Sequence, residues 1–207
     1  FICNPNNPTG TMLSTNEIDS ALAKIPGHVV VVLDEAYYEY VRDAGYQDSL
    51  RYVRDGGSVV VLRTFSKIYG LAGLRVGYGI TTPEIAGYVN RVRPPFNVNS
   101  LAQEAAKAAL LDDEHVTKSR AMNEAEMTFL EEGLSKMGFK TVPTQANFIY
   151  FDVGIDGAAM YNALLREGVI VRHIRGSMIR VTIGQPTENR RLLEALEHVM
   201  PSLSKSA

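Results

Sequence analysis

The sequence is poor in cysteine and has no long apolar run. Cys3 is the one cysteine in 207 residues, which excludes an intrachain disulfide framework and a multi-cysteine zinc site and fits a reducing cytoplasm. Nowhere do about 18 apolar residues follow one another without a charge or a turn former. These absences predict a cytoplasmic protein with no membrane partner, in which Cys3 is a buried strand residue.

An excess of positive charge is also missing. The 21 lysines and arginines stand against 23 acidic residues, for a net charge of −2, which disfavours a nucleic-acid partner. The four histidines are scattered without the short spacings of metal-ligand motifs, so we predict no metal site. The hydrophobic fraction of 45% and the charged fraction of 21% are those of a globular protein that can bury a core.

Strand and helix patterns alternate through residues 1–92. The apolar, valine-rich run at 28–33 is typical of a strand covered on both faces by helices. The other strands are expected at 1–3, 58–62 and 75–80, and the helices at 14–25 and 49–55. This order predicts an α/β domain with a mainly parallel sheet.

The pattern changes after residues 81–83, and over residues 93–207 it predicts linking helices followed by a small α+β domain. Helices are expected at 84–93, 101–111, 114–136, 158–167 and 187–200, and strands at 148–152, 169–172 and 179–183. We therefore expect two domains, of which the first is incomplete, because the chain begins with what reads as the end of a strand.

Three strand ends in the first domain carry polar groups: residues 4–10, Asp34 and Lys67. In an open parallel sheet ligands bind beyond the carboxyl ends of the strands. A lysine there can be partly desolvated, and its neutral amine then attacks a carbonyl. Lysine as a Schiff base, with an aspartate opposing a pyridinium nitrogen, is what a pyridoxal phosphate site requires. Arg75 and nearby hydroxyls could hold the phosphate.

Four motifs in this order resemble the fold-type I pyridoxal-phosphate aminotransferases. They are Asn4–Gly10, Asp34–Tyr37, Thr64–Lys67 and Arg75. Residues 63–78, 95–99 and 179–184 resemble histidinol-phosphate aminotransferases most, and the similarity runs from residue 1 to about residue 200. The resemblance implies a partial large domain and a small C-terminal domain of the pyridoxal-phosphate transferase fold.

The resemblance also implies a role for each site residue. Lys67 is the catalytic residue that forms the Schiff base and then carries a proton between the substrate and the cofactor. Asp34 pairs with the pyridinium nitrogen, and Arg180, helped by Arg172, binds the anionic group of the substrate. The residues implied to bind the cofactor are Asn7, Asp34, Tyr37, Thr64, Ser66, Lys67 and Arg75.

The implied reaction moves an amino group between histidinol phosphate, the amino donor, and 2-oxoglutarate, the 2-oxo acid. Aromatic aminotransferases and threonine-phosphate decarboxylases share the cofactor motifs and remain alternatives. Family members are usually homodimers, so a homodimer is expected. The loop between Arg172 and Arg180 is shorter than is usual in the family.

An alternative from another class starts from Asp34 and Glu35. After the apolar run they also resemble the Walker B end of a P-loop ATPase, although the chain contains no Walker A motif. Glu35 is otherwise expected to be structural, and Tyr38 and Tyr40 to pack. The resemblance further implies that a missing N-terminal half supplies part of the site, so we expect the 207 residues alone to be inactive.

Overall fold

A computed structural model describes residues 1–203 in two compact units. Unit 1 comprises Phe1–Asn6 and Met12–Ser119, and unit 2 comprises Asn7–Thr11 and the chain from Arg120 onward. The domain division predicted after residue 92 stays a prediction, and its last four residues, 204–207, lie outside the described part. No described helix is long and apolar enough to cross a membrane.

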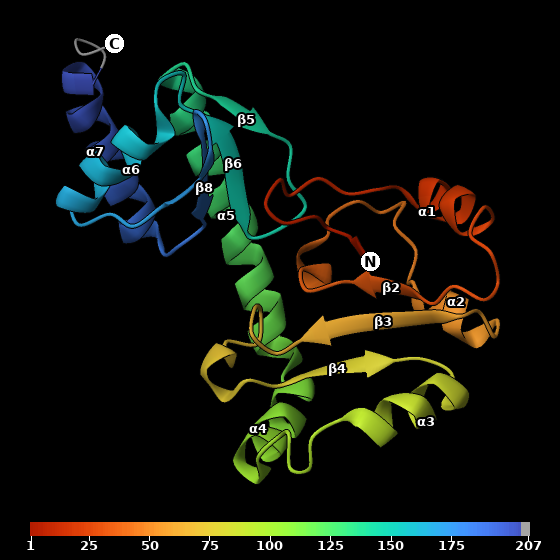
Figure 1. Cartoon of the computed structure of the whole chain (residues 1–207). Coiled ribbons are helices and arrows are strands. Elements are labelled where there is room, and N and C mark those ends of the chain that lie inside the picture. The colour runs from red at the N-terminus through yellow and green to blue at the C-terminus, as the bar shows by residue number, and fades with distance from the viewer. Residues whose placement is uncertain (204–207) are drawn as a thin grey trace. The chain divides into compact units, whose positions relative to one another are not determined.

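Unit 1 is built on a four-stranded sheet with the order β1-β2-β3-β4 (Figure 1). β1, β2 and β3 are parallel, and β4 is antiparallel to β3. The strands are β1 Ile2–Cys3, β2 Val31–Asp34, β3 Val59–Thr64 and β4 Gly77–Ile80. This mixed, mostly parallel sheet confirms the predicted α/β class. The loop after β3 returns β4 beside it, because no helix long enough for a parallel crossover separates the two strands.

One face of this sheet packs on two helices. Val31 and Leu33 of β2 and Val59 and Val61 of β3 form an apolar cluster, because alternate side chains of a strand point to the same face. The helices are α1 Thr15–Leu22, capped by a Ser14–Glu17 capping box, and α2 Leu50–Arg54.

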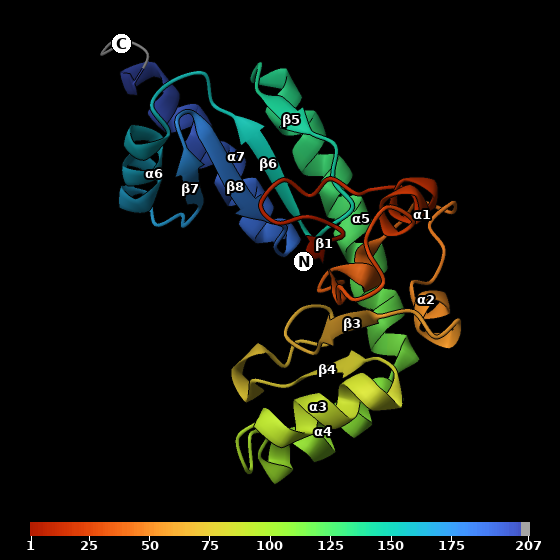
Figure 2. The same cartoon turned by 45° about the vertical axis from the view of Figure 1, so that its right-hand side comes forward.

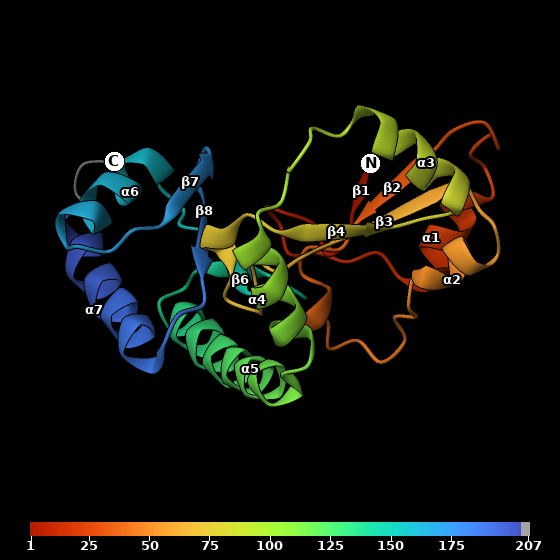
Figure 3. The same cartoon turned by 90° about the horizontal axis from the view of Figure 1, so that it is seen from below.

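The apolar run at 28–33 is covered less than expected. Val30 remains 48% exposed, and the Val29 N–H donates to the Pro26 carbonyl in a turn at 2.9 Å, so the strand begins only at Val31. α3 Pro83–Val92 lies on the opposite side of the sheet from α1 and α2 (Figure 3).

The remaining elements of unit 1 surround the loops at the carboxyl ends of its strands. They are the short 3-10 helices η1 Tyr38–Tyr40 and η2 Ala72–Leu74, the helix α4 Ser100–Leu110 and the beginning of α5 Asp113–Lys136. Ala102 and Ala106 of α4 pack against Phe65 and Val76, which flank the loop between β3 and β4. α4 therefore supports the loop that carries Lys67.

Unit 2 contains an antiparallel sheet with the order β5-β6-β8-β7 (Figure 2). Its strands are β5 Lys140–Val142, β6 Phe148–Asp152, β7 Arg172–Arg175 and β8 Met178–Thr182. The helices α6 Gly157–Arg166 and α7 Pro186–Leu203 and the second part of α5 complete the unit. Their apolar faces and one face of the sheet form a single core of seventeen buried residues. This unit confirms the predicted α+β part.

Two further local expectations are wrong, and one strand was not expected. The strand expected at 169–172 begins only at Arg172, because Ile170 is 77% exposed in the connection from α6. β5 was not expected, since three residues are too few for a pattern. Cys3 is exposed and not buried, because β1 is the edge strand and has a hydrogen-bonded neighbour on one side only.

Candidate functional site

The carboxyl ends of β2 and β3 lie side by side in unit 1. Asp34, the last residue of β2, pairs in register with Leu62 of β3, and β3 ends at Thr64. The half-buried Asp34 carboxylate accepts a hydrogen bond from the Ala36 N–H at 3.1 Å, which turns the chain directly after the strand. Parallel pairing therefore brings an acid on one strand next to the residues that follow the other.

Buried anchors hold the loop that carries Lys67. Phe65 and Ile68 on either side of it are both 3% exposed. The Phe65 ring lies 5.5 Å from the Tyr78 ring, and the Ile68 carbonyl lies 2.8 Å from His115 Nε2. Because both sides of the loop are fixed, the Lys67 side chain projects from a rigid base.

The Lys67 amine lies over an aromatic ring. Its Nζ is 5.1 Å from the centroid of the buried Tyr37 ring, within the range of a cation–π contact. Among residues 1–203 no carboxylate lies at ion-pair distance from Lys67 or from Arg75. Both cations are therefore available for an anionic ligand.

Donors for a phosphate group follow β3. Thr64 Oγ1 accepts a hydrogen bond from the Ser66 N–H at 3.0 Å and keeps its own O–H to donate. Arg75 adopts a left-handed backbone conformation with φ of 53°, and its Nη1 donates to the Ala72 carbonyl at 2.8 Å. Two hydroxyls, a backbone turn and an exposed guanidinium thus lie on one loop.

The remaining predicted residues lie in unit 2. The Arg180 guanidinium donates a hydrogen bond to Asn7 Oδ1, and its Cζ lies 4.9 Å from the centroid of the Phe148 ring. Arg180 Nε is buried without a hydrogen-bond partner among the described residues. The structure thus brings Asn7 and Arg180 together, although 173 positions separate them in the sequence.

Arg172 lies directly opposite Arg180 on the neighbouring strand. The hairpin between β7 and β8 turns at Gly176, which has a φ of 53°. The short loop noted in the sequence therefore sets the register that pairs Arg172 with Arg180. Like charges directly opposite each other on a sheet repel, and an anion between them would offset that cost. A carboxylate or phosphate suits two guanidinium groups.

The donor set of unit 1 fits pyridoxal phosphate. The fit rests on the Lys67 amine, which has no carboxylate partner within residues 1–203, on an acid at the neighbouring strand end and on a loop of phosphate donors. Six of the nine predicted residues lie in unit 1, and Asn7, Arg172 and Arg180 lie in unit 2. The roles of all nine stay predictions.

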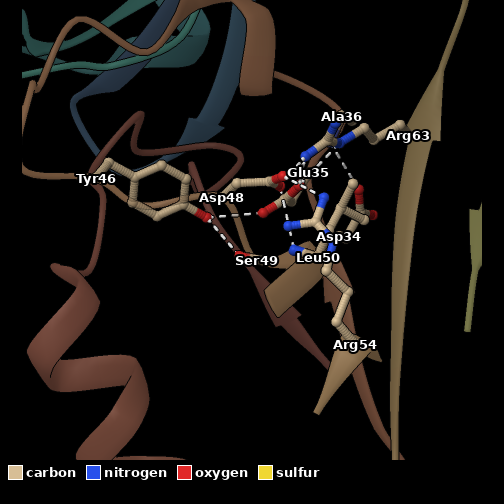
Figure 4. Close-up of polar contacts among 9 residues, drawn as sticks. All are labelled: Asp34, Glu35, Ala36, Tyr46, Asp48, Ser49, Leu50, Arg54 and Arg63. Atoms are coloured by element: carbon tan, nitrogen blue, oxygen red, sulfur yellow. Dashed lines mark hydrogen bonds and ion pairs between the residues drawn. The ribbon is translucent and has the colours of Figure 1, made fainter. Parts of the chain in front are cut away.

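Sequence reasoning missed a polar cluster beneath the strand ends (Figure 4). The fully buried Glu35 carboxylate pairs with Arg63 at 2.9 Å and accepts from the Tyr46 hydroxyl at 2.8 Å, and Arg63 also contacts Asp48 at 3.0 Å. Burial, and then the Glu35 charge, raise the pKa of Tyr46. Burial opposes the charge of Arg63, but Glu35 outweighs it and raises the Arg63 pKa. The sequence signal that could have indicated this cluster is Arg63, a charged residue directly after the apolar run 59–62.

A cavity of about 960 Å³ lies elsewhere in unit 1. Its lining includes Phe65, Tyr78, Lys107 and residues 95–98 of the motif at 95–99. None of the nine predicted site residues lines it. Among the described residues no group of three or more His, Cys, Asp or Glu side chains could hold a metal ion.

Comparisons with known proteins bear on the family and the fold. The chain is 50% identical over 204 residues to histidinol-phosphate aminotransferase 1 of Nitrosococcus oceani, covering 97% of this chain and 55% of that protein. A putative histidinol-phosphate aminotransferase from Erwinia carotovora atroseptica superposes with a TM-score of 0.92 at 26% identity, covering 97% of this chain and 59% of the other. The enzyme of Sinorhizobium meliloti, in complex with pyridoxal-5'-phosphate, gives 0.89 at 28% identity, covering 97% and 57%.

The chain spans about half the length of the curated relatives that it matches. The family model for class I and II aminotransferases matches residues 1–196. This match covers both sheets and the polar strand ends, and it leaves no basis for the P-loop ATPase alternative. With motifs, fold and match in agreement over nearly its whole length, the chain belongs to the class I and II aminotransferases, of fold type I.

Proposed function

We propose that the protein containing this chain is a pyridoxal-phosphate-dependent aminotransferase that moves an amino group between histidinol phosphate and 2-oxoglutarate. The observation that carries the proposal is the position of Lys67. Its amine has no carboxylate partner among the described residues, lies over the Tyr37 ring and follows the strand next to Asp34. The histidinol-phosphate aminotransferases named above, about half of whose length this chain covers, support the choice of substrate.

The residues of unit 1 bind the cofactor and move the proton. Asp34, fixed at the end of β2, holds a proton on the ring nitrogen by its negative charge. Thr64, Ser66 and Arg75 bind the phosphate through charge-assisted hydrogen bonds. Lys67 would hold the cofactor and would carry the proton that leaves the substrate carbon. The bound cofactor supplies a ring that accepts the electrons left by that proton.

The residues of unit 2 bind the substrate and the ring oxygen. The Arg180 guanidinium, with its buried and unpaired Nε, binds the phosphate or carboxylate of the substrate. Arg172 on the facing strand adds a second positive charge. Asn7, whose Oδ1 accepts a hydrogen bond from Arg180, would donate its amide N–H to the phenolic oxygen of the cofactor. The family resemblance assigns the Tyr37 hydroxyl to the same oxygen.

Absorption spectroscopy of the complete protein with added pyridoxal phosphate tests this proposal. We expect a yellow adduct that borohydride traps, and peptide mapping should place the label on Lys67. Lys24→Ala, which removes an exposed lysine of the same unit, is the control and should label normally. A colourless protein, or label on another lysine, would sink the proposal.

Half-reactions rank the substrates. Histidinol phosphate should convert the bound cofactor faster than phenylalanine or threonine phosphate does. A faster reaction with phenylalanine would indicate an aromatic aminotransferase, and loss of carbon dioxide from threonine phosphate would indicate a decarboxylase. Each result leaves the cofactor site unchanged and corrects only the substrate.

We further propose that the complete protein is a cytoplasmic homodimer. The single cysteine and the family resemblance support this assignment. Light scattering of the complete protein should give twice the mass of one chain. The 207 residues expressed alone should bind cofactor weakly and show no turnover, because the relatives are almost twice as long.

A further inference from the structure

The two faces of the unit 1 sheet carry different residues at the carboxyl ends of β2 and β3. Glu35 continues the face of Val31 and Leu33, and Arg63 continues the face of Val59 and Val61. These four apolar residues pack against α1 and α2. The Glu35–Arg63 pair therefore closes the end of an apolar core with charges.

Asp34 and Thr64 belong to the other face, because successive side chains of a strand alternate. Asp34 immediately precedes Glu35, and Thr64 immediately follows Arg63. The two residues proposed to meet the ring nitrogen and the phosphate are thus chain neighbours of the two halves of one buried ion pair. Any movement of the pair is transmitted through a single peptide unit.

A third contact extends the pattern to Tyr37. The Arg63 guanidinium stacks on the Tyr38 ring with its Cζ 3.7 Å from the centroid, and Tyr38 follows Tyr37 directly. The residues that this guanidinium contacts, and Arg63 itself, thus adjoin three proposed cofactor residues, which lie on two segments of the chain. Asp34 and Tyr37 lie on the segment after β2, and Thr64 ends β3.

The geometry of the pair is closely defined. Arg63 directs both Nε, at 3.0 Å, and Nη2, at 2.9 Å, to Glu35 Oε2. The Tyr46 hydroxyl donates to Glu35 Oε1 at 2.8 Å and lies 3.1 Å from Ser49 Oγ (Figure 4). The side-chain exposures are 0% for Glu35 and 10% for Arg63. A buried pair with this many hydrogen bonds contributes rigidity more than net stability.

The backbone at the same point is held as well. The Asn4 N–H donates to the Asp34 carbonyl at 3.0 Å, and the Glu35 N–H donates to the Leu62 carbonyl at 2.9 Å. The peptide between Asp34 and Glu35 is thus fixed from both neighbouring strands. The Glu35 side chain adds the remaining restraint, which prevents the chain from twisting at the strand end.

We propose that Glu35 and Arg63 are positioning residues for the cofactor: they orient Asp34 toward the ring nitrogen and Thr64 toward the phosphate without touching either group. This inference rests on the proposed function, since it needs a cofactor at Asp34. Its observable consequence is electronic. A displaced Asp34 leaves the ring nitrogen less protonated, and the ring then withdraws electrons less strongly from the linkage to Lys67.

The experiment measures the bound cofactor and not only turnover. In the complete protein the absorbance of the Lys67-bound cofactor is titrated with pH for the wild type, Glu35→Gln and Arg63→Lys. We expect both variants to move the spectroscopic midpoint upward by about half a unit or more and to weaken cofactor binding by about tenfold, as loss of outer-shell partners does at metal sites. Glu35→Asp keeps the negative charge that Glu35→Gln removes, so its midpoint should lie between those of Glu35→Gln and the wild type.

A matched control exists in the same unit. Asp19, Arg51 and Tyr52 form a second cluster of an acid, an arginine and a tyrosine, with Arg51 Nη2 2.6 Å from Asp19 Oδ1 and the Tyr52 hydroxyl at 2.7 Å. Asp19 is on α1 and Arg51 on α2, and neither adjoins a proposed cofactor residue. Asp19→Asn should lower the thermal stability of the apoprotein and leave the spectroscopic midpoint unchanged.

The outcomes separate the two proposals. A wild type with no label on Lys67 refutes the proposed function. If the wild type is labelled and the Glu35 and Arg63 variants titrate like Asp19→Asn, the positioning role is refuted and the function stands. Should these variants not fold, Tyr46→Phe removes one hydrogen bond to Glu35 with little change in volume. It should shift the midpoint in the same direction, and an unshifted midpoint there also refutes the role.

Discussion

The two units are stabilised by different means. Unit 2 has a single core of seventeen buried apolar residues, and its arginines project from regular strands that this core supports. Unit 1 has smaller clusters, with four buried apolar residues beneath its sheet and four more around Phe65, and a buried ion pair closes the end of the first cluster. The proposed cofactor residues of unit 1 lie at strand ends and in the loops that follow them, and the proposed substrate anchors lie on strands in unit 2. The difference suggests that polar contacts position chemistry where the apolar core is small.

The largest effect is expected at Lys67. Lys67→Ala in the complete protein should lower kcat by about 10²- to 10⁴-fold or more, because it removes the group that moves the proton. Steady-state kinetics with histidinol phosphate measure it, and Lys24→Ala is the control. An unchanged kcat would contradict the proposal that unit 1 supplies the group that moves the proton.

The same substitution in the two cores compares their packing. Leu134→Ala in unit 2 and Leu33→Ala in unit 1 both truncate a leucine that is at most 1% exposed. We expect losses of about 4–5 and about 2–3 kcal/mol in the free energy of unfolding, because half-buried neighbours of Leu33 can relax into the space. Urea denaturation measures both. Equal losses would show that the smaller cluster is packed as rigidly as the larger one.

Substitution of Arg180 and Arg172 tests the proposed binding of the substrate's anionic group. Arg180→Lys should raise KM for histidinol phosphate by about 10- to 100-fold, because lysine lacks the paired donors of a guanidinium. Arg172→Lys should raise KM by no more than about fivefold, since Arg172 is exposed. Initial rates at varied substrate concentration separate the two variants. A larger effect at Arg172 would reverse the assignment of the main anchor.

The smallest effect is expected on the loss of folding stability at alkaline pH. Burial, and then the Glu39 charge, raise the pKa of Tyr69 to about 12, above the value of about 10 of an unfolded tyrosine. The folded state therefore keeps a proton that the unfolded state loses, and stability falls as pH rises from about 10 to 12. Tyr69→Phe should flatten this fall, and Tyr88→Phe on α3 should not. Thermal denaturation across this pH range measures it.

Much of the fold was predictable because its signals are local. The helix after Ser14, the strand at 148–152 and the end of α5 follow from capping, a continuous apolar run and glycine, in that order. β5 and the start of β7 were not predictable, since short strands depend on the neighbour that pairs with them. The exposure of Cys3 depends on the edge position of β1, which no local pattern shows.

The sequence by itself determined the family, the fold class and the residue types at the strand ends, because these are properties of short segments. Only the tertiary structure decided that Glu35 pairs with Arg63, that Arg172 faces Arg180 and that Asn7 accepts from Arg180. These contacts join residues 8 to 173 positions apart. Strand register and packing set such distances, and neither is encoded in any one segment.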